Sequence, residues 1–250
     1  MTTAVPLAPL ARTTRPAGPS LGALTGVEVR KSLSTRSGKA VAGGAVLLGP
    51  VAMLLGSLVD SGAIPAPTIL GFAAMLTALL LLALGVLSTA GEWTHRSVQV
   101  TFLLVPRRLR VLASKGLAVA FQGAAISAVG AALSVAVLWA IPDAVAWGGL
   151  GRAVAVAVAG GAAFALVGAG IGAALGNSTA ALTGTYLVML GVLPVMSTFQ
   201  PTLASNVDPT TSLLKLAEDG VVARPVLVLA AWVLVALAAG ALVSRRRSVQ

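Results

Sequence analysis

The sequence predicts an all-α polytopic membrane protein with six transmembrane helices, preceded by an interfacial amphipathic helix. Hydrophobic residues make up 57% of the 250 positions and charged residues only 10%, so the chain cannot surround an ordinary core with a polar surface. Six apolar segments approach the roughly 20 residues that a helix needs to cross a bilayer. The basic residues lie outside these segments, as expected beside membrane spans.

The N-terminal region precedes the first span in two parts. Residues 1–20 are rich in Ala, Thr and Pro and lack an apolar signal-peptide core, which predicts a disordered cytoplasmic tail. Residues 21–39 are basic and helix-compatible, with Glu28 and Lys31 three positions apart. Their apolar residues do not form one clean stripe, so an interfacial helix and a simple basic anchor are both open interpretations.

The predicted spans contain no Asp, Glu, Lys, Arg or His, so they lack the usual markers of an ion or proton pathway. Together they define one membrane domain, residues 40–245, followed by a basic cytoplasmic tail, residues 246–250. The spans run from Ala40 to Val59, Thr68 to Ala90, Gly116 to Ile141, Ala153 to Gly176, Ala180 to Phe199 and Val226 to Val243.

The distribution of basic residues predicts the orientation. Fourteen of the 17 Lys and Arg residues lie in the N-terminal region, the segment 92–115 and the C-terminal tail. The positive-inside rule therefore predicts a multi-pass protein of the cell membrane with both termini in the cytoplasm. No basic face on a soluble fold is available for nucleic acid, so we expect no nucleic-acid partner.

Two further segments leave alternatives open. Residues 200–225 are expected to form a partly helical external element, and the letters do not tell whether it enters the bilayer. Gly168, Gly172 and Gly176 repeat at four-residue spacing, which lets helix backbones approach closely. This stripe could serve a dimer contact, but packing within one six-helix bundle is the favoured interpretation.

The chain lacks the groups that covalent chemistry needs. It has one histidine and no cysteine, and Glu92-x-x-His95 alone supplies only part of a di-iron ligand set. No phosphate-binding G-x-x-x-x-G-K-[ST] motif is present. We therefore expect no catalytic residues, no metal and no cofactor in this chain, which is predicted not to be an enzyme.

One polar loop, from Glu92 to Lys115, is dense in functional groups. Glu92 is followed by Ser97, an apolar-rich run, Pro106-Arg107-Arg108 and Lys115, which opens the next span. Together with Glu28-x-x-Lys31 before the first span and the large last gap, this pattern resembles the permease subunits of ABC-2 type transporters. The resemblance covers about residues 21–245, although Arg96-Ser97 stands where the family more often has Gly-Thr.

The resemblance implies a dimer, with a second copy or a related permease, that binds two cytoplasmic ABC ATPase subunits. ATP would be bound and hydrolysed by those partners, and the loop would supply the coupling helix that docks on them. Alternation at Val98, Val100 and Phe102 suggests a strand, but we expect a short helix that ends before Pro106. The residues expected to dock are Glu92, Arg96, Ser97, Val98, Thr101, Phe102 and Leu103.

The basic second half of the loop has two interpretations. Arg107, Arg108, Arg110 and Lys115 could contact an ATPase, or they could only obey the positive-inside rule and meet lipid headgroups.

The leading hypothesis is a permease subunit that exports a hydrophobic or amphipathic substrate. The alternative is a non-transporting membrane scaffold or assembly protein in the lipid bilayer. Polar residues within the spans are candidates for lining a pathway, although hydrogen bonding inside the chain would explain most of them as well. These residues are Thr77, Gln122, Thr183, Tyr186 and Ser197.

Overall fold

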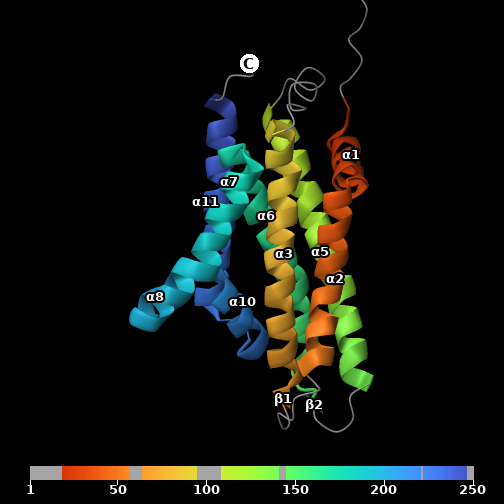
Figure 1. The fold of residues 1–250 in the computed structure, drawn as a ribbon, viewed down its shortest axis with the longest axis vertical. Helices are drawn as coiled ribbons and strands as arrows, with labels where there is room; N and C mark the ends of the chain where they lie inside the picture. The colour runs from red at the N-terminus through yellow and green to blue at the C-terminus, as the bar shows by residue number, and fades with distance from the viewer. Residues whose placement is uncertain (1–18, 57–63, 95–107, 141–144, 221, 247–250) are drawn as a thin grey trace, which may run out of the picture.

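The computed structural model describes residues 19–56, 64–94, 108–140, 145–220 and 222–246, which are almost entirely helical. Figure 1 shows long helices side by side, with the start of α1 (Leu21–Ser34) and the end of α11 (Ala223–Arg246) at one end, here called the termini end. Six helical segments are long and apolar enough to cross a membrane. The predicted all-α polytopic fold is confirmed.

The other elements follow in chain order. They are α2 (Arg36–Gly56), β1 (Ile64–Pro65), α3 (Ala66–Thr94), α5 (Arg108–Ala140), β2 (Val145–Ala146), α6 (Leu150–Leu175), α7 (Ser178–Tyr186), the π-helix η1 (Leu187–Val192), α8 (Leu193–Phe199), α9 (Pro201–Val207) and α10 (Pro209–Glu218). The short strands β1 and β2 pair in parallel. The predicted interfacial segment 21–39 thus comprises α1 and the first turn of α2.

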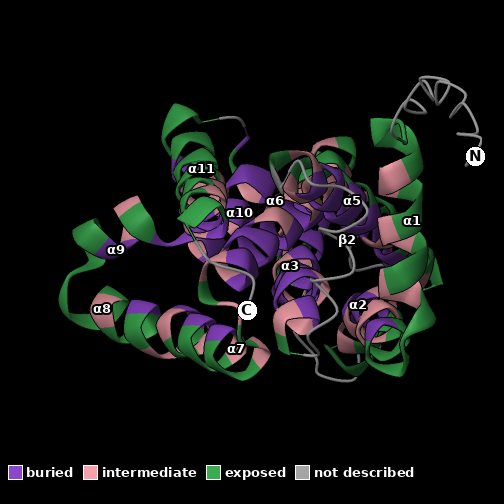
Figure 2. Cartoon of the chain, turned by 90° about the horizontal axis from the view of Figure 1, so that it is seen from above, coloured by how far each residue is buried: buried purple, intermediate pink, exposed green. Residues whose placement is uncertain are grey.

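Helix α3 lies at the centre of the bundle, with α2, α5 and α6 packed around it (Figure 2). In its most apolar window 72% of the residues are buried, compared with 17% in α11. The buried residues of α3 fall on every side of the helix, as expected for a helix that is apolar all round.

The glycine stripe of α6 serves the contact between α6 and α3. A Cβ added to Gly168 would lie 2.0 Å from the carbonyl oxygen of Leu82, and one on Gly172 would lie 2.3 Å from Oγ1 of Thr89. Gly176 ends α6 with φ 63°, a conformation that favours glycine. The stripe therefore packs within one bundle, as favoured from the sequence.

The observed helices extend beyond the predicted spans. Helix α3 continues to Thr94, and α5 begins at Arg108 although the span was predicted from Gly116. A span predicted from a run of apolar residues stops at the first charged residue. The helix itself can continue past that residue when the charge binds a partner or faces water. The helices therefore carry charges that the predicted spans lack, among them Glu92, Lys115 and Arg152.

The fifth predicted span is helical but irregular. The N–H of Leu193 bonds to the carbonyl of Val188, five residues earlier, in the π-helix η1. Pro194 explains this widened turn, because proline lacks an N–H and its ring crowds the carbonyl four residues before it. Helix α8 leans away from the bundle (Figures 1 and 2), and Phe199 at its end is 76% exposed.

The segment 200–225 is partly helical, as predicted, and part of it enters the bundle. A Cβ on Gly160 would lie 2.4 Å from Leu213 of α10, and Gly160 lies about 15 Å along α6 from its start, at 1.5 Å per residue. Nε1 of Trp232 in α11 donates to the carbonyl of Val207 over 2.7 Å. Part of the predicted external segment therefore packs among the other helices as α10.

Two side chains fix the ends of α10. The buried Asp208 carboxylate accepts from the backbone N–H of Thr210 over 2.8 Å and from its hydroxyl over 2.6 Å, which caps the N-terminus. At the other end the Arg152 guanidinium donates to the carbonyls of Ala217 and Glu218, where a cation is favoured by the helix dipole. The Asp208 carboxylate is therefore buried among helices whose apolar composition had predicted spans without acidic residues.

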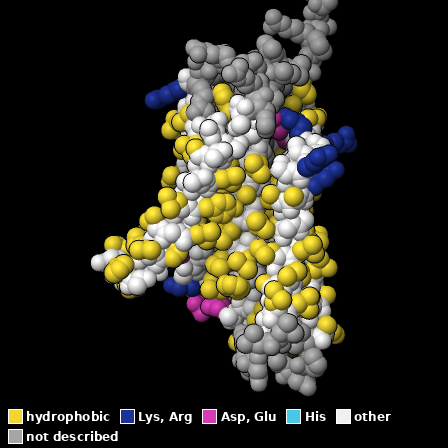
Figure 3. Space-filling view, in the orientation of Figure 1, with side chains coloured by type: hydrophobic (Ala, Val, Ile, Leu, Met, Phe, Trp, Pro, Cys, Tyr) yellow, Lys and Arg dark blue, Asp and Glu magenta, His cyan; other side chains and the backbone are white. Residues whose placement is uncertain are grey.

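The visible surface is apolar between charged levels. In Figure 3 hydrophobic side chains cover the middle of the bundle, basic side chains gather at the termini end, and further charged side chains lie at the level of α10. This arrangement fits a helix bundle surrounded by lipid.

Candidate functional site

The site begins at the corner between α1 and α2. Thr35 interrupts the helix with an extended backbone (φ −80°, ψ 149°), and its hydroxyl accepts from the N–H of Gly38 over 3.0 Å. A Cβ on Gly38 would lie 1.8 Å from the carbonyl oxygen of Ser32, so only glycine fits this corner without displacing the backbone. The corner lays α1 beside the first turns of α5.

Four charged residues meet beneath α1, and we call them the charged junction: Glu28 and Lys31 of α1, Glu92 of α3 and Lys115 of α5. Nζ of Lys115 lies 2.6 Å from Oε2 of Glu28 and 2.8 Å from Oε1 of Glu92. Nζ of Lys31 lies 3.1 Å from Oε1 of Glu28 and also contacts Oε1 of Glu92. Each lysine therefore bridges both carboxylates, and the four charges sum to zero.

Burial makes the junction energetically sensitive. The side chains of Lys115, Glu92 and Glu28 are only 7%, 10% and 11% exposed, whereas that of Lys31 is 44% exposed. Removing one partner from a buried pair costs about 3–5 kcal/mol, because the other charge stays desolvated. The junction thus ties three helices together at a point where none of the inner charges can be removed cheaply.

Lys31 is the member of the junction that faces outward. Burial alone would lower the pKa of its ammonium, but the hydrogen bond to Glu92 and the charges of Glu92 and Glu28 outweigh burial and raise the pKa above its ordinary value of 10.5. Lys31 is therefore held protonated, and the junction keeps its balance of charge at neutral pH.

Gln122 extends the contact between α1 and α5 beyond the junction. It is buried, and its Nε2 donates to the carbonyl of Val29 over 3.2 Å and to the hydroxyl of Ser32 over 2.5 Å. The sequence placed Gln122 among the pathway candidates, and the structure shows that it holds α1 against α5.

The other pathway candidates are also placed. Oγ1 of Thr77 donates to the carbonyl of Ala45, and the hydroxyl of Tyr186 donates to the carbonyl of Leu79. Ser197 donates to the carbonyl of Pro194 within its own helix, and Thr183 is exposed on α7. The structure does not bring the five candidates together at one surface.

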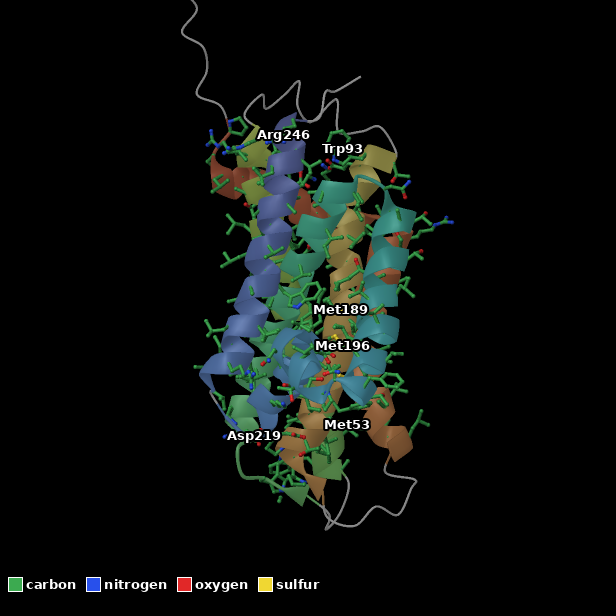
Figure 4. All side chains as sticks on the ribbon, turned by 90° about the vertical axis from the view of Figure 1, so that its left-hand side faces the viewer. Met53, Trp93, Met189, Met196, Asp219 and Arg246 are labelled. Carbon is green, nitrogen blue, oxygen red and sulfur yellow. The ribbon has the colours of Figure 1, made fainter. Side chains whose placement is uncertain are left out.

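Of the seven predicted docking residues, only Glu92 belongs to the described chain. Arg96, Ser97, Val98, Thr101, Phe102 and Leu103, with the predicted short helix after Ser97, lie outside the described residues. Helix α3 ends at Thr94, two residues after Glu92, and α5 begins at Arg108, seven residues before Lys115. The side chains of Glu92 and Lys115 form an ion pair. Figure 4 shows Trp93, the neighbour of Glu92, at the termini end with Arg246.

The structure corrects both interpretations offered for Lys115. Its ammonium is buried and bound to Glu28 and Glu92, so it neither contacts lipid headgroups nor forms a surface for an ATPase. One sign of the junction was present in the sequence, because the two glutamates and the two lysines balance in charge. What the letters could not give is that α1 folds back across α3 and α5.

Within the described residues, no three His, Cys, Asp or Glu side chains gather closely enough to hold a metal ion. No protein-family model matches the sequence, and a search of curated proteins found no match. The multi-pass, membrane-spanning class of the protein therefore stands on its six apolar helices.

Proposed function

We propose that this chain is the permease subunit of an ABC transporter of the ABC-2 type, which exports a hydrophobic or amphipathic substrate from the cell membrane. In this proposal both termini are cytoplasmic, the permease acts as a dimer, and separate ATPase subunits bind and hydrolyse ATP. The observation that carries the proposal is the charged junction, which joins both ends of the loop 92–115 to the helix before the first span.

The junction supports coupling for a mechanical reason. A loop that transmits the motion of a partner must be tied firmly to the helices that it moves. Glu92 and Lys115 bind each other over 2.8 Å and both bind α1, so a force applied to the loop would act on α1, α3 and α5 together. Ion pairs that serve only to neutralise charge would not need to join three helices at this one place.

The test is co-purification with the ATPase. Where a neighbouring gene encodes an ABC ATPase, the chain is expressed with that ATPase, and capture of one protein is followed by detection of the other. A double variant with Phe102→Ala and Leu103→Ala should reduce capture at least about tenfold, as expected when central apolar contacts of an interface are lost. A matched control, Leu234→Ala, removes an apolar side chain that is 67% exposed on α11 and should leave capture unchanged.

Two outcomes would reject the proposal. Capture that is equal in the double variant and the control would remove the docking role of the loop. Substrate export by the chain in vesicles that contain no ATPase would remove the ABC assignment itself.

A further inference from the structure

Three exposed cations surround the corner between α1 and α2, and we call them the basic corner: Arg30 of α1, with Arg36 and Lys39 of α2. Arg36 and Lys39 are three positions apart, so they share one face at the start of α2. Figure 3 shows basic side chains gathered at the termini end over α1 and the start of α2. This charge therefore belongs to one small region, where the chain enters its first span.

Among the described residues, no acidic side chain pairs with the basic corner. The nearby carboxylates are those of Glu28 and Glu92, and both bind Lys31 and Lys115 in the charged junction. The other five acidic residues of the chain follow the far ends of α2 and α5 in the sequence or belong to the segment 200–225. The counter-charge of the corner must therefore come from outside the chain.

The dipole of α2 adds to the positive charge of the corner. Arg36 and Lys39 stand at the start of a 21-residue helix whose first turn has no acidic residue, and the free N–H groups there already carry partial positive charge. Arg245 and Arg246 are placed differently, because they lie in the last turn of α11, where the dipole favours cations. Both regions are basic, but the electrostatic demand for an anion is greater at the corner.

The position of the corner selects a lipid headgroup as this anion. Lys39 directly precedes the apolar run of α2, whose outer face includes Leu47, 55% exposed. Helix α1 exposes Val27 to 54% one turn from Arg30, and in the view from above it lies lengthwise along the edge of the bundle (Figure 2). Exposed apolar side chains next to cations are typical of a helix at the membrane interface.

We propose that the basic corner binds the phosphate headgroup of an anionic lipid in the leaflet at the termini end. The guanidinium groups of Arg30 and Arg36 and the ammonium of Lys39 supply the charge-assisted N–H donors that phosphate oxygens accept. An acyl chain of the same lipid lies along the outer face of α2. The bound lipid anchors α1 at the membrane surface. The assignment needs neither an ATPase nor transport, so it can fail or hold independently of the proposed function.

Quenching of a fluorophore by brominated lipids tests the assignment, because the natural chain has no cysteine and a single one can be labelled. Gly43→Cys places a bimane label on α2, where an added Cβ has nothing within 4 Å, about 6 Å along the helix from Lys39. Leu242→Cys, at a residue that is 55% exposed, places the control label on α11, about 5 Å along the helix from Arg245. Nanodiscs contain phosphatidylcholine and phosphatidylglycerol, and either one or the other is brominated.

The label at Gly43→Cys should report a preference for phosphatidylglycerol of about fivefold, which corresponds to about 1 kcal/mol. Raising the salt concentration from about 0.05 M to about 0.5 M should reduce this preference at least about twofold, because salt screens exposed charges. The label at Leu242→Cys should report a preference of at most about twofold, since the dipole of α11 opposes the charge of its last turn.

Two double variants that remove the same charge locate the binding. Arg36→Gln with Lys39→Gln should lower the preference at the Gly43→Cys label below about twofold, because one cation then remains at the corner. Arg245→Gln with Arg246→Gln removes two charges from the same end of the bundle and should leave the preference at this label unchanged.

Equal quenching by the two brominated lipids at Gly43→Cys would overturn the proposal, as would an equal loss of preference in the two double variants. A preference that survives Arg36→Gln with Lys39→Gln would also overturn it, and loss of ATPase capture by that variant would then assign the corner to an acidic protein surface. If Gly43→Cys does not fold, Ala40→Cys places the label at an exposed residue of the same helix and is read in the same way.

Discussion

Helix α3 contacts its neighbours in two physically different ways. It packs closely against α6, and through Glu92 it takes part in the charged junction. Against α6 it relies on shape: Gly85 and Gly168 bring two backbones so close that an added Cβ would lie 2.0 Å from a carbonyl oxygen of the other helix. At the termini end it relies on charge: Glu92 binds Lys115 of α5 and Lys31 of α1. The close contact between α3 and α6 fits only one arrangement of the two backbones, whereas ion pairs keep much of their energy when helices shift slightly. The α3–α6 contact is therefore suited to stay fixed and the junction to transmit motion.

The largest loss of stability is expected when the innermost charge of the junction is removed. Lys115→Met keeps an unbranched side chain but leaves Glu28 and Glu92 facing only the half-exposed Lys31. The variant should lose about 3–5 kcal/mol of unfolding free energy, measured by thermal unfolding in detergent micelles. Lys39→Met, at an exposed lysine of α2, is the control and should change stability little.

A double-mutant cycle shows whether the junction acts as one unit. Glu28→Gln should cost less in the Lys115→Met background than in the natural chain, with a coupling of about 0.5–3 kcal/mol. Additive effects would mean that the two residues stabilise the protein independently and that the junction does not act as one unit.

The addition of a single methyl group tests the α3–α6 contact. Gly168→Ala drives a methyl group against the carbonyl of Leu82 and should destabilise by about 1–3 kcal/mol. Gly43→Ala on α2 has nothing within 4 Å of the added Cβ and should stabilise by up to about 1 kcal/mol, the helix propensity gain of alanine. Opposite signs in the two melting curves are expected, and equal signs would show that shape does not limit this contact.

A milder change tests the outer edge of the junction. Lys31→Met leaves Lys115 bound to both carboxylates, and the lost side chain is 44% exposed, so solvent screens much of its contribution. The cost should be about 1 kcal/mol or less, clearly below that of Lys115→Met. Similar losses in the two variants would show that burial does not set the strength of these ion pairs.

The sequence predicted the helices better than their contacts. Runs of apolar residues located all six spans because length and hydropathy are local properties. The charged junction joins residues as far apart in the chain as Glu28 and Lys115. Predicting it would have required knowledge of how α1 lies across the bundle. The buried Asp208 was hidden for a related reason: prolines and polar residues around it are typical of an external loop, whereas packing draws α10 between α3, α6 and α11.

The last prediction concerns the pH dependence that Lys31 gives to the junction. Because its pKa is raised on folding above 10.5, Lys31 contributes stability that is fully present below this pH and is lost as the pH rises through the folded pKa. The difference in melting temperature between the natural chain and Lys31→Met should therefore stay constant from about pH 8 to about pH 10 and shrink above that. Taking the difference removes the titration of the other lysines, which both proteins share. A difference that stays the same at every pH at which both proteins remain folded would mean that Lys31 stabilises the junction through the packing of its alkyl chain and not through its charge.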